Sequence, residues 1–98
     1  MDDLNLHDFE ILDLNINYSS AYINIYLCSS NNISYCLKVQ EFKKFQINHE
    51  EPWGTGIYIN ASELLFNKNH MYYELTLELN SGDEISVISI KEPFLEQV

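Results

Sequence analysis

The chain has 98 residues, of which 46% are hydrophobic and 13% aromatic, so it can bury a core without metals or disulfides. Five lysines, no arginine and fifteen carboxylates give a net charge of −10. This balance argues against direct binding to nucleic acid or to an anionic membrane surface, because both depend on basic side chains. We expect one globular domain over residues 1–98.

No apolar run approaches the length of a membrane span, and the first ten residues, MDDLNLHDFE, are acidic where a signal peptide is basic. We therefore expect a cytoplasmic protein. Cys28 and Cys36 lack the spacing of a zinc site, and nothing else suggests an oxidising compartment. We expect two free thiols, one or both partly buried.

The stretch EILDLNINYSSAYINIYLCSS predicts two antiparallel strands around a polar turn. Period two places one apolar set on the first strand and another on the second: Leu12, Leu14, Ile16 and Ile23, Ile25, Leu27. The opposite face of the second strand carries Tyr22, Asn24 and Tyr26, which meet either water or a partner.

A third strand is predicted after the turn SSNN, with Ile33, Tyr35, Leu37 and Val39 in phase. In the next run, QEFKKFQIN, Phe42 is out of phase with the apolar residues that follow it. We expect either a bulge or a bend between strands near Lys43 and Lys44, where the chain changes register, and a change of sheet at the same place is an open alternative.

The run ELTLELNSGDEISVISI is the clearest hairpin, with Gly82 available for a positive φ in its turn. In its return strand Ile85 and Val87 give way to Ile88 and Ile90, which predicts either a phase shift or a strand covered on both faces. Before this hairpin, ASELLFNKNH has helical character, with Ser62 as a candidate N-cap of a single turn.

About seven short strands with regularly spaced turns predict an all-β fold. The architecture we expect is a single antiparallel sandwich or a partly open barrel, with at most one short helical turn.

The sequence contains Ser, Cys, His and acidic residues, which are the types used in nucleophilic catalysis, but no sequence motif that arranges them as a catalytic site. No GxSxG elbow is present, and His7, His49 and His70 lack the spacing of metal ligands on one element. We therefore expect no catalytic, metal or cofactor site, and we do not expect an enzyme. Trp53 has two interpretations: it fills one end of the core, or it is an exposed anchor beside Glu50, Glu51 and Tyr58.

Three segments together carry a resemblance: LHDFEI at 6–11, PWGTGIYIN at 52–60 and LTLELNSGDEISV at 75–87. The chain resembles small bacterial all-β proteins with an amino-terminal Leu-His-Asp and a mid-chain Pro-Trp-Gly-x-Ser. Gly56 stands where that pattern has Ser. Similar small acidic domains are immunity proteins of polymorphic toxin and contact-dependent growth inhibition systems, so the resemblance implies that this chain binds and neutralises a cognate toxin.

The expected partner is a basic protein toxin, such as a nuclease, since carboxylates steer a basic surface and aromatic side chains slow its dissociation. One alternative is a ligand-binding or enzymatic domain with a cleft near His7, Asp8 and Trp53. Another is a structural subunit that self-associates through a strand edge. The residues expected to contact the toxin are Glu50, Glu51, Trp53, Tyr58, Tyr22, Tyr26, Glu74 and Glu78.

Overall fold

Alternating apolar and polar residues form β-strands throughout the part of the chain that the computed structural model describes, residues 5–48 and 57–98. The strands are β1 (Glu10–Asn17), β2 (Tyr22–Cys28), β3 (Ser34–Gln40), β4 (Phe42–Ile47), β5 (Ile59–Asn67), β6 (Tyr72–Leu79), β7 (Glu84–Ser89) and β8 (Phe94–Gln97). No helix occurs among the described residues.

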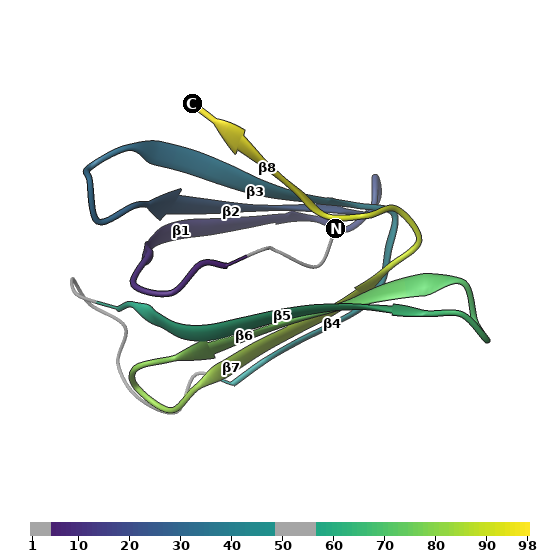
Figure 1. Ribbon diagram of the computed structural model, residues 1–98. Helices are drawn as coiled ribbons and strands as arrows, with labels where there is room; N and C mark the ends of the chain where they lie inside the picture. Colours follow the sequence, from purple (N-terminus) through teal and green to yellow (C-terminus); the bar gives the residue numbers. More distant parts are fainter. Residues whose placement is uncertain (1–4, 49–56) are drawn as a thin grey trace.

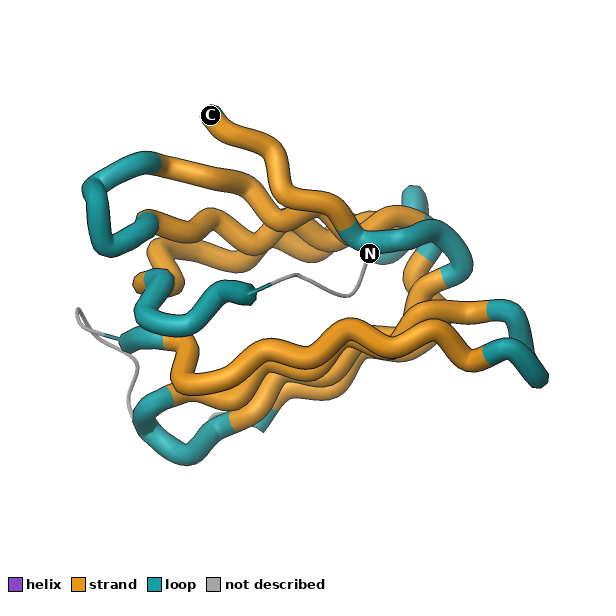
Figure 2. The backbone as a smooth tube through the Cα atoms, viewed as in Figure 1, coloured by secondary structure: helices purple, strands orange, loops and turns teal. Residues whose placement is uncertain are grey.

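The strands form two four-stranded antiparallel sheets, which lie one above the other (Figures 1 and 2). Sheet A has the order β1-β2-β3-β8, and sheet B has the order β4-β7-β6-β5. Every neighbouring pair within the two sheets is antiparallel. The predicted all-β fold is confirmed: the two packed antiparallel sheets are consistent with the expected sandwich or partly open barrel, with eight strands among the described residues where about seven were expected.

The core lies between the two sheets and is built from the inward-facing residues of both. In β2 and β6 every second side chain is buried, as the alternation predicts. The strand residues of the core are Ile11, Ile23, Ile25, Leu27, Leu37, Val39, Ile59, Leu75, Leu77, Leu79, Ile85 and Val87. These side chains point away from water, and the opposite face of each sheet is turned toward solvent.

The bulge predicted near Lys43 and Lys44 is confirmed. The pairing of β4 with β7 shifts between Phe42 and Lys44, which returns Phe42 to the inward side. The chain also changes sheet here, because β3 belongs to sheet A and β4 to sheet B. Glu41 between them has a φ of 54°, the left-handed conformation that turns the chain sharply.

The helical turn predicted over residues 61–70 is wrong. Residues up to Asn67 belong to β5, and a turn follows that leads into β6. Ser62 is not an N-cap: it lies in mid-strand opposite Leu77, and its Oγ accepts a hydrogen bond from the Leu6 amide at 3.0 Å. The apolar cluster of Leu64 and its neighbours suggested a helix because it does not alternate with polar residues.

Two details of the predicted apolar faces are also wrong. Leu12 is 54% exposed, because a register shift between Ile11 and Asp13 makes Ile11 the buried residue of that strand. In β7 there is neither a phase shift nor a second covered face, since alternation continues through the buried Ser89. The Ser89 hydroxyl donates to the Lys91 carbonyl at 2.8 Å, which satisfies the buried polar group.

The chain before β1 covers the first half of β5. The Asp8 amide donates to the Ile59 carbonyl at 2.8 Å, and the Ile59 amide donates to the Phe9 carbonyl at 2.9 Å. Leu6 is buried at the same place, next to Ser62. The two sheets are thus connected at this edge, whereas the second half of β5 is a sheet edge that no other strand of residues 5–48 and 57–98 covers.

Candidate functional site

The outer face of sheet A is mainly neutral and polar. Tyr22, Asn24 and Tyr26 of β2 point outward, and Asn24 pairs across the strands with Lys38. Lys38 Nζ lies 2.9 Å from Glu96 Oε1, and this hydrogen bond raises the pKa of the Lys38 ammonium. Amides and phenols dominate the rest of this face, so it offers hydrogen bonds rather than net charge.

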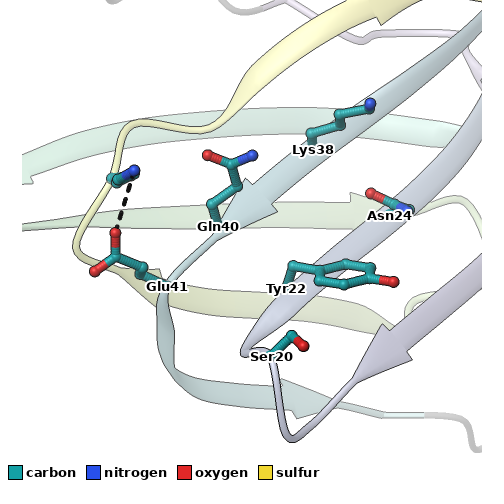
Figure 3. A pocket seen from close by; sticks show the side chains of 7 residues that line it. Ser20, Tyr22, Asn24, Lys38, Gln40 and Glu41 are labelled. Carbon is teal, nitrogen blue, oxygen red and sulfur yellow. Dashed lines mark ion pairs between the residues drawn. The ribbon is translucent and has the colours of Figure 1, made fainter.

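A hollow of about 450 Å³ lies on this face of sheet A (Figure 3). Its lining consists of Ser20, Tyr22, Asn24, Lys38, Gln40, Glu41 and Lys91. The side chains of β2 and β3 project from the same side of the sheet, and Glu41 and Lys91 form an ion pair of 3.3 Å at one end. Both lysines of the hollow are therefore paired with carboxylates.

The outer face of sheet B is acidic. Glu63 of β5, Glu74 and Glu78 of β6, and Glu84 of β7 all point away from the core, and we call these four residues the acidic face. Lys43 and Lys44 are both exposed at the bulge of β4, and Lys44 lies opposite Ile88 of β7. No ion pair of the described residues includes a carboxylate of the acidic face.

The acidic face places like charges together at the end next to the turn between β6 and β7. Glu78 and Glu84 are direct cross-strand partners, and Glu63 lies opposite Thr76, which is two residues before Glu78 in β6. Like charges directly opposite each other in a sheet are destabilising. The isolated fold gains nothing from this arrangement, which is the property expected of a surface that receives cationic groups.

A shallow hollow of about 350 Å³ lies among these carboxylates. Its lining is Ala61, Ser62, Glu63, Thr76, Glu78 and Glu84. The described residues contain no group of three or more His, Cys, Asp or Glu side chains able to hold a metal ion. Three of its lining side chains, those of Glu63, Glu78 and Glu84, are carboxylates, so the hollow has a negative charge.

Apolar side chains border the acidic face near Glu74. Leu65 and Ile88 are its cross-strand neighbours on either side, and Tyr72 precedes it by two residues on the same face. Leu65 is 53% exposed. The Asn67 amide nitrogen donates to Glu74 at 3.3 Å, which fixes this carboxylate between the apolar residues. Charge and exposed apolar surface thus adjoin, as in protein interfaces.

The structure separates the residues predicted to contact a partner. Tyr22 and Tyr26 lie on the outer face of sheet A, whereas Glu74 and Glu78 lie on the outer face of sheet B. Tyr58 lies at the edge joining the sheets, where it pairs with Glu10. Glu50, Glu51 and Trp53 lie outside the described residues. One flat partner surface cannot meet both tyrosines and both glutamates.

Sequence reasoning missed two members of the acidic face. The sequence predicts a helical turn around Glu63, which gives no strand face for this side chain, whereas the residue lies in β5. Glu84 was recoverable, because it directly follows the predicted NSGD turn and alternates with the buried Ile85. Counting outward from that turn pairs Glu84 with Glu78.

A third hollow, of about 430 Å³, lies at the edge where the sheets are connected. Its lining is Asp8, Glu10, Cys28, Ser29, Ser30, Asn32 and Tyr58. His7 is not part of the lining: its Nδ1 lies 2.7 Å from the Asn60 carbonyl oxygen, and its Nε2 lies 3.5 Å from Asp8 Oδ1. This hollow holds Asp8 without the neighbouring imidazole.

Both cysteines are free thiols on sheet A, Cys28 half-buried and Cys36 buried. Burial raises the pKa of the Cys36 thiol; Lys38 lowers it and Glu96 raises it, with smaller effects. Because the thiolate is the reactive form, a raised pKa and a buried sulfur both slow modification of Cys36.

We expect a disulfide reagent at about pH 8 to modify Cys28 at least about tenfold faster than Cys36. Stopped-flow absorbance traces of the thiol reaction in the native protein would then show two phases. The Cys28→Ser variant would show only the slow phase. Equal rates for the two thiols in the folded protein would contradict the placement of Cys36.

None of the described residues form a helix that could cross a membrane. Comparison of the chain with known protein families, with curated proteins and with solved structures found no match.

Proposed function

We propose that this chain is an immunity protein that binds a basic bacterial toxin through the acidic face of sheet B and neutralises it. The partner we infer is a protein that exposes lysines and arginines, as a nuclease does where it holds phosphate. The proposed role uses binding alone, with no reaction on this chain and no cofactor.

The observation that carries the proposal is the direct opposition of Glu78 and Glu84 at the turn end of the acidic face, where neither carboxylate forms an ion pair with a described residue. A cationic side chain placed between two carboxylates relieves their repulsion, so binding gains the energy that the free sheet loses. A net charge of −10 also raises the rate at which a basic partner is encountered. The carboxylates of Glu78 and Glu84 thus account both for the repulsion within the free protein and for the attraction to a basic partner.

The other two hollows support their functions less well. The one on sheet A is neutral overall, since Lys38 and Lys91 are paired with Glu96 and Glu41. The hollow at the connected edge holds Asp8 and Tyr58, but His7 lies outside it, so the ligand-binding or enzymatic alternative loses one of its residues. We therefore place the function on sheet B.

The test is co-expression with the product of the adjacent open reading frame, followed by purification at about 0.1 M and about 1 M salt. These conditions shorten the screening length from about 10 to about 3 Å. We expect a stable complex that is recovered in lower yield at high salt, and we expect the neighbouring gene to be toxic when expressed alone. A harmless neighbour that forms no complex at either salt concentration would overturn the proposal.

A further inference from the structure

The hairpin between β5 and β6 extends beyond the sandwich (Figure 1). We call residues 65–73 the arm. Pairing between β6 and β7 ends at Tyr73 and Ser89, whereas pairing between β5 and β6 continues to Asn67 and Tyr72. The end of the arm therefore has no neighbouring strand among the described residues other than its own partner, and both of its faces are accessible.

The arm exposes large apolar side chains. Leu65 is 53% exposed, Phe66 44% and Met71 65%. Leu65 faces the same side as the acidic face, and Phe66 faces the opposite side. The Phe66 ring contacts that of Tyr73 with centroids 4.8 Å apart, which holds the arm in shape without covering Phe66.

Met71 occupies an unfavourable backbone conformation at the end of the arm. Its φ is 57°, in the left-handed region where glycine and asparagine are preferred. The turn is held by Asn67, whose Oδ1 accepts hydrogen bonds from the Asn69 and His70 amides at 3.0 and 3.1 Å. The Asn67 carbonyl also accepts from the Met71 amide at 2.8 Å.

The hairpin between β1 and β2 has a similar turn but a different residue. There Asn17 Oδ1 accepts from the Ser20 amide at 2.9 Å, and the left-handed residue is Ala21 with a φ of 55°. The turn geometry therefore does not require a long apolar side chain. Met71 has two unfavourable features, a left-handed backbone and an exposed flexible apolar side chain. Burial of that side chain by a partner would offset both.

We propose that the arm inserts into an apolar recess of the same basic partner, with Met71 as its tip, while the acidic face meets the cationic surface around that recess. Glu74 connects the two surfaces, since it lies between Leu65 and Ile88 at the base of the arm. The partner is thus a protein whose apolar crevice is bordered by lysines or arginines. This inference rests on the proposed function.

The test is the Met71→Gly variant, with the purified product of the adjacent open reading frame as the probe. Glycine relieves the left-handed strain, so we expect Tm to stay the same or rise by up to about 5 °C. We expect Kd to increase at least about tenfold, because the tip contact is lost. Ala21→Gly is the matched control, with a similar change in Tm and an unchanged Kd.

Met71→Asn is the second variant, since asparagine tolerates the left-handed region and keeps the turn if glycine loosens it. An unchanged Kd in both folded Met71 variants, with binding lost in a variant of the acidic face, would contradict insertion of the arm into the partner. The proposed function would still hold in that case. No binding by the wild-type chain would overturn both. Self-association that disappears in Met71→Gly, with partner affinity unchanged, would assign the arm to a second copy of this chain and overturn the inference.

Discussion

Replacing Leu77 by alanine is expected to lower the free energy of unfolding by about 3–5 kcal/mol. Leu77 is fully buried in β6, an inner strand of sheet B, between Ser62 of β5 and Ile85 of β7. Neighbouring strands hold the backbone on both sides, so the core cannot close over the missing side chain. A loss of this size is a large part of the stability of a domain of this length.

The matched control is Leu65→Ala in the same sheet, where the side chain is 53% exposed. We expect this control to cost less than about 1 kcal/mol. Urea denaturation followed by tryptophan fluorescence and circular dichroism would measure both variants. A Leu77→Ala variant as stable as the control would contradict the packing of the two sheets.

The second large effect is expected from reversing the charge of Glu78 and Glu84 in the acidic face. The double variant Glu78→Lys with Glu84→Lys changes the net charge by four units, and we expect its association with the basic partner to slow about 30-fold or more. Two like charges still oppose each other across the strands, so the stability of the fold should remain close to that of the wild type.

The single variant Glu84→Lys separates stability from binding. It places an ammonium directly opposite Glu78, which should stabilise the sheet by roughly 0.2–1 kcal/mol while weakening the complex. Opposite effects on Tm and on affinity are difficult to obtain from damage to the fold. They would show that the acidic face is arranged for the partner at some cost to the free protein.

The control for this series reverses two carboxylates on the other sheet. Asp13 and Glu96 lie on the outer face of sheet A, as the cross-strand partners of Tyr26 and Cys36. The double variant Asp13→Lys with Glu96→Lys gives the same net charge as the reversal on sheet B. If the control slows association as much as the reversal on sheet B, net charge explains the effect and the acidic face has no special role.

The sequence predicts the fold best where both faces of a strand have different surroundings. In β2 and β6 one side faces the core and the other faces water, so buried and exposed residues alternate. The second half of β5 lies in the arm, where both sides are partly exposed and Leu65 and Phe66 point in opposite directions. Without alternation, the same apolar residues fitted a helical turn.

The candidate site was predictable only in part, because period two gives the face of a strand but not its neighbours. It correctly turns Glu74 and Glu78 outward and groups Tyr22 with Tyr26. It cannot show that these pairs lie on opposite sides of the sandwich, since that depends on where the chain crosses between sheets at Glu41. The position of Met71 was hidden for a similar reason, because backbone φ is not visible in composition.

The most direct test of the acidic face is the association rate constant of the wild-type chain and of the Glu78→Lys, Glu84→Lys double variant, measured by stopped flow with the product of the adjacent open reading frame. Measurements from about 0.05 to about 1 M salt vary the screening of exposed charges. We predict that the wild-type rate constant falls steeply with salt and that the variant is slower, with a flat or reversed dependence. Equal rate constants with equal salt dependence would contradict a role for the acidic face in binding.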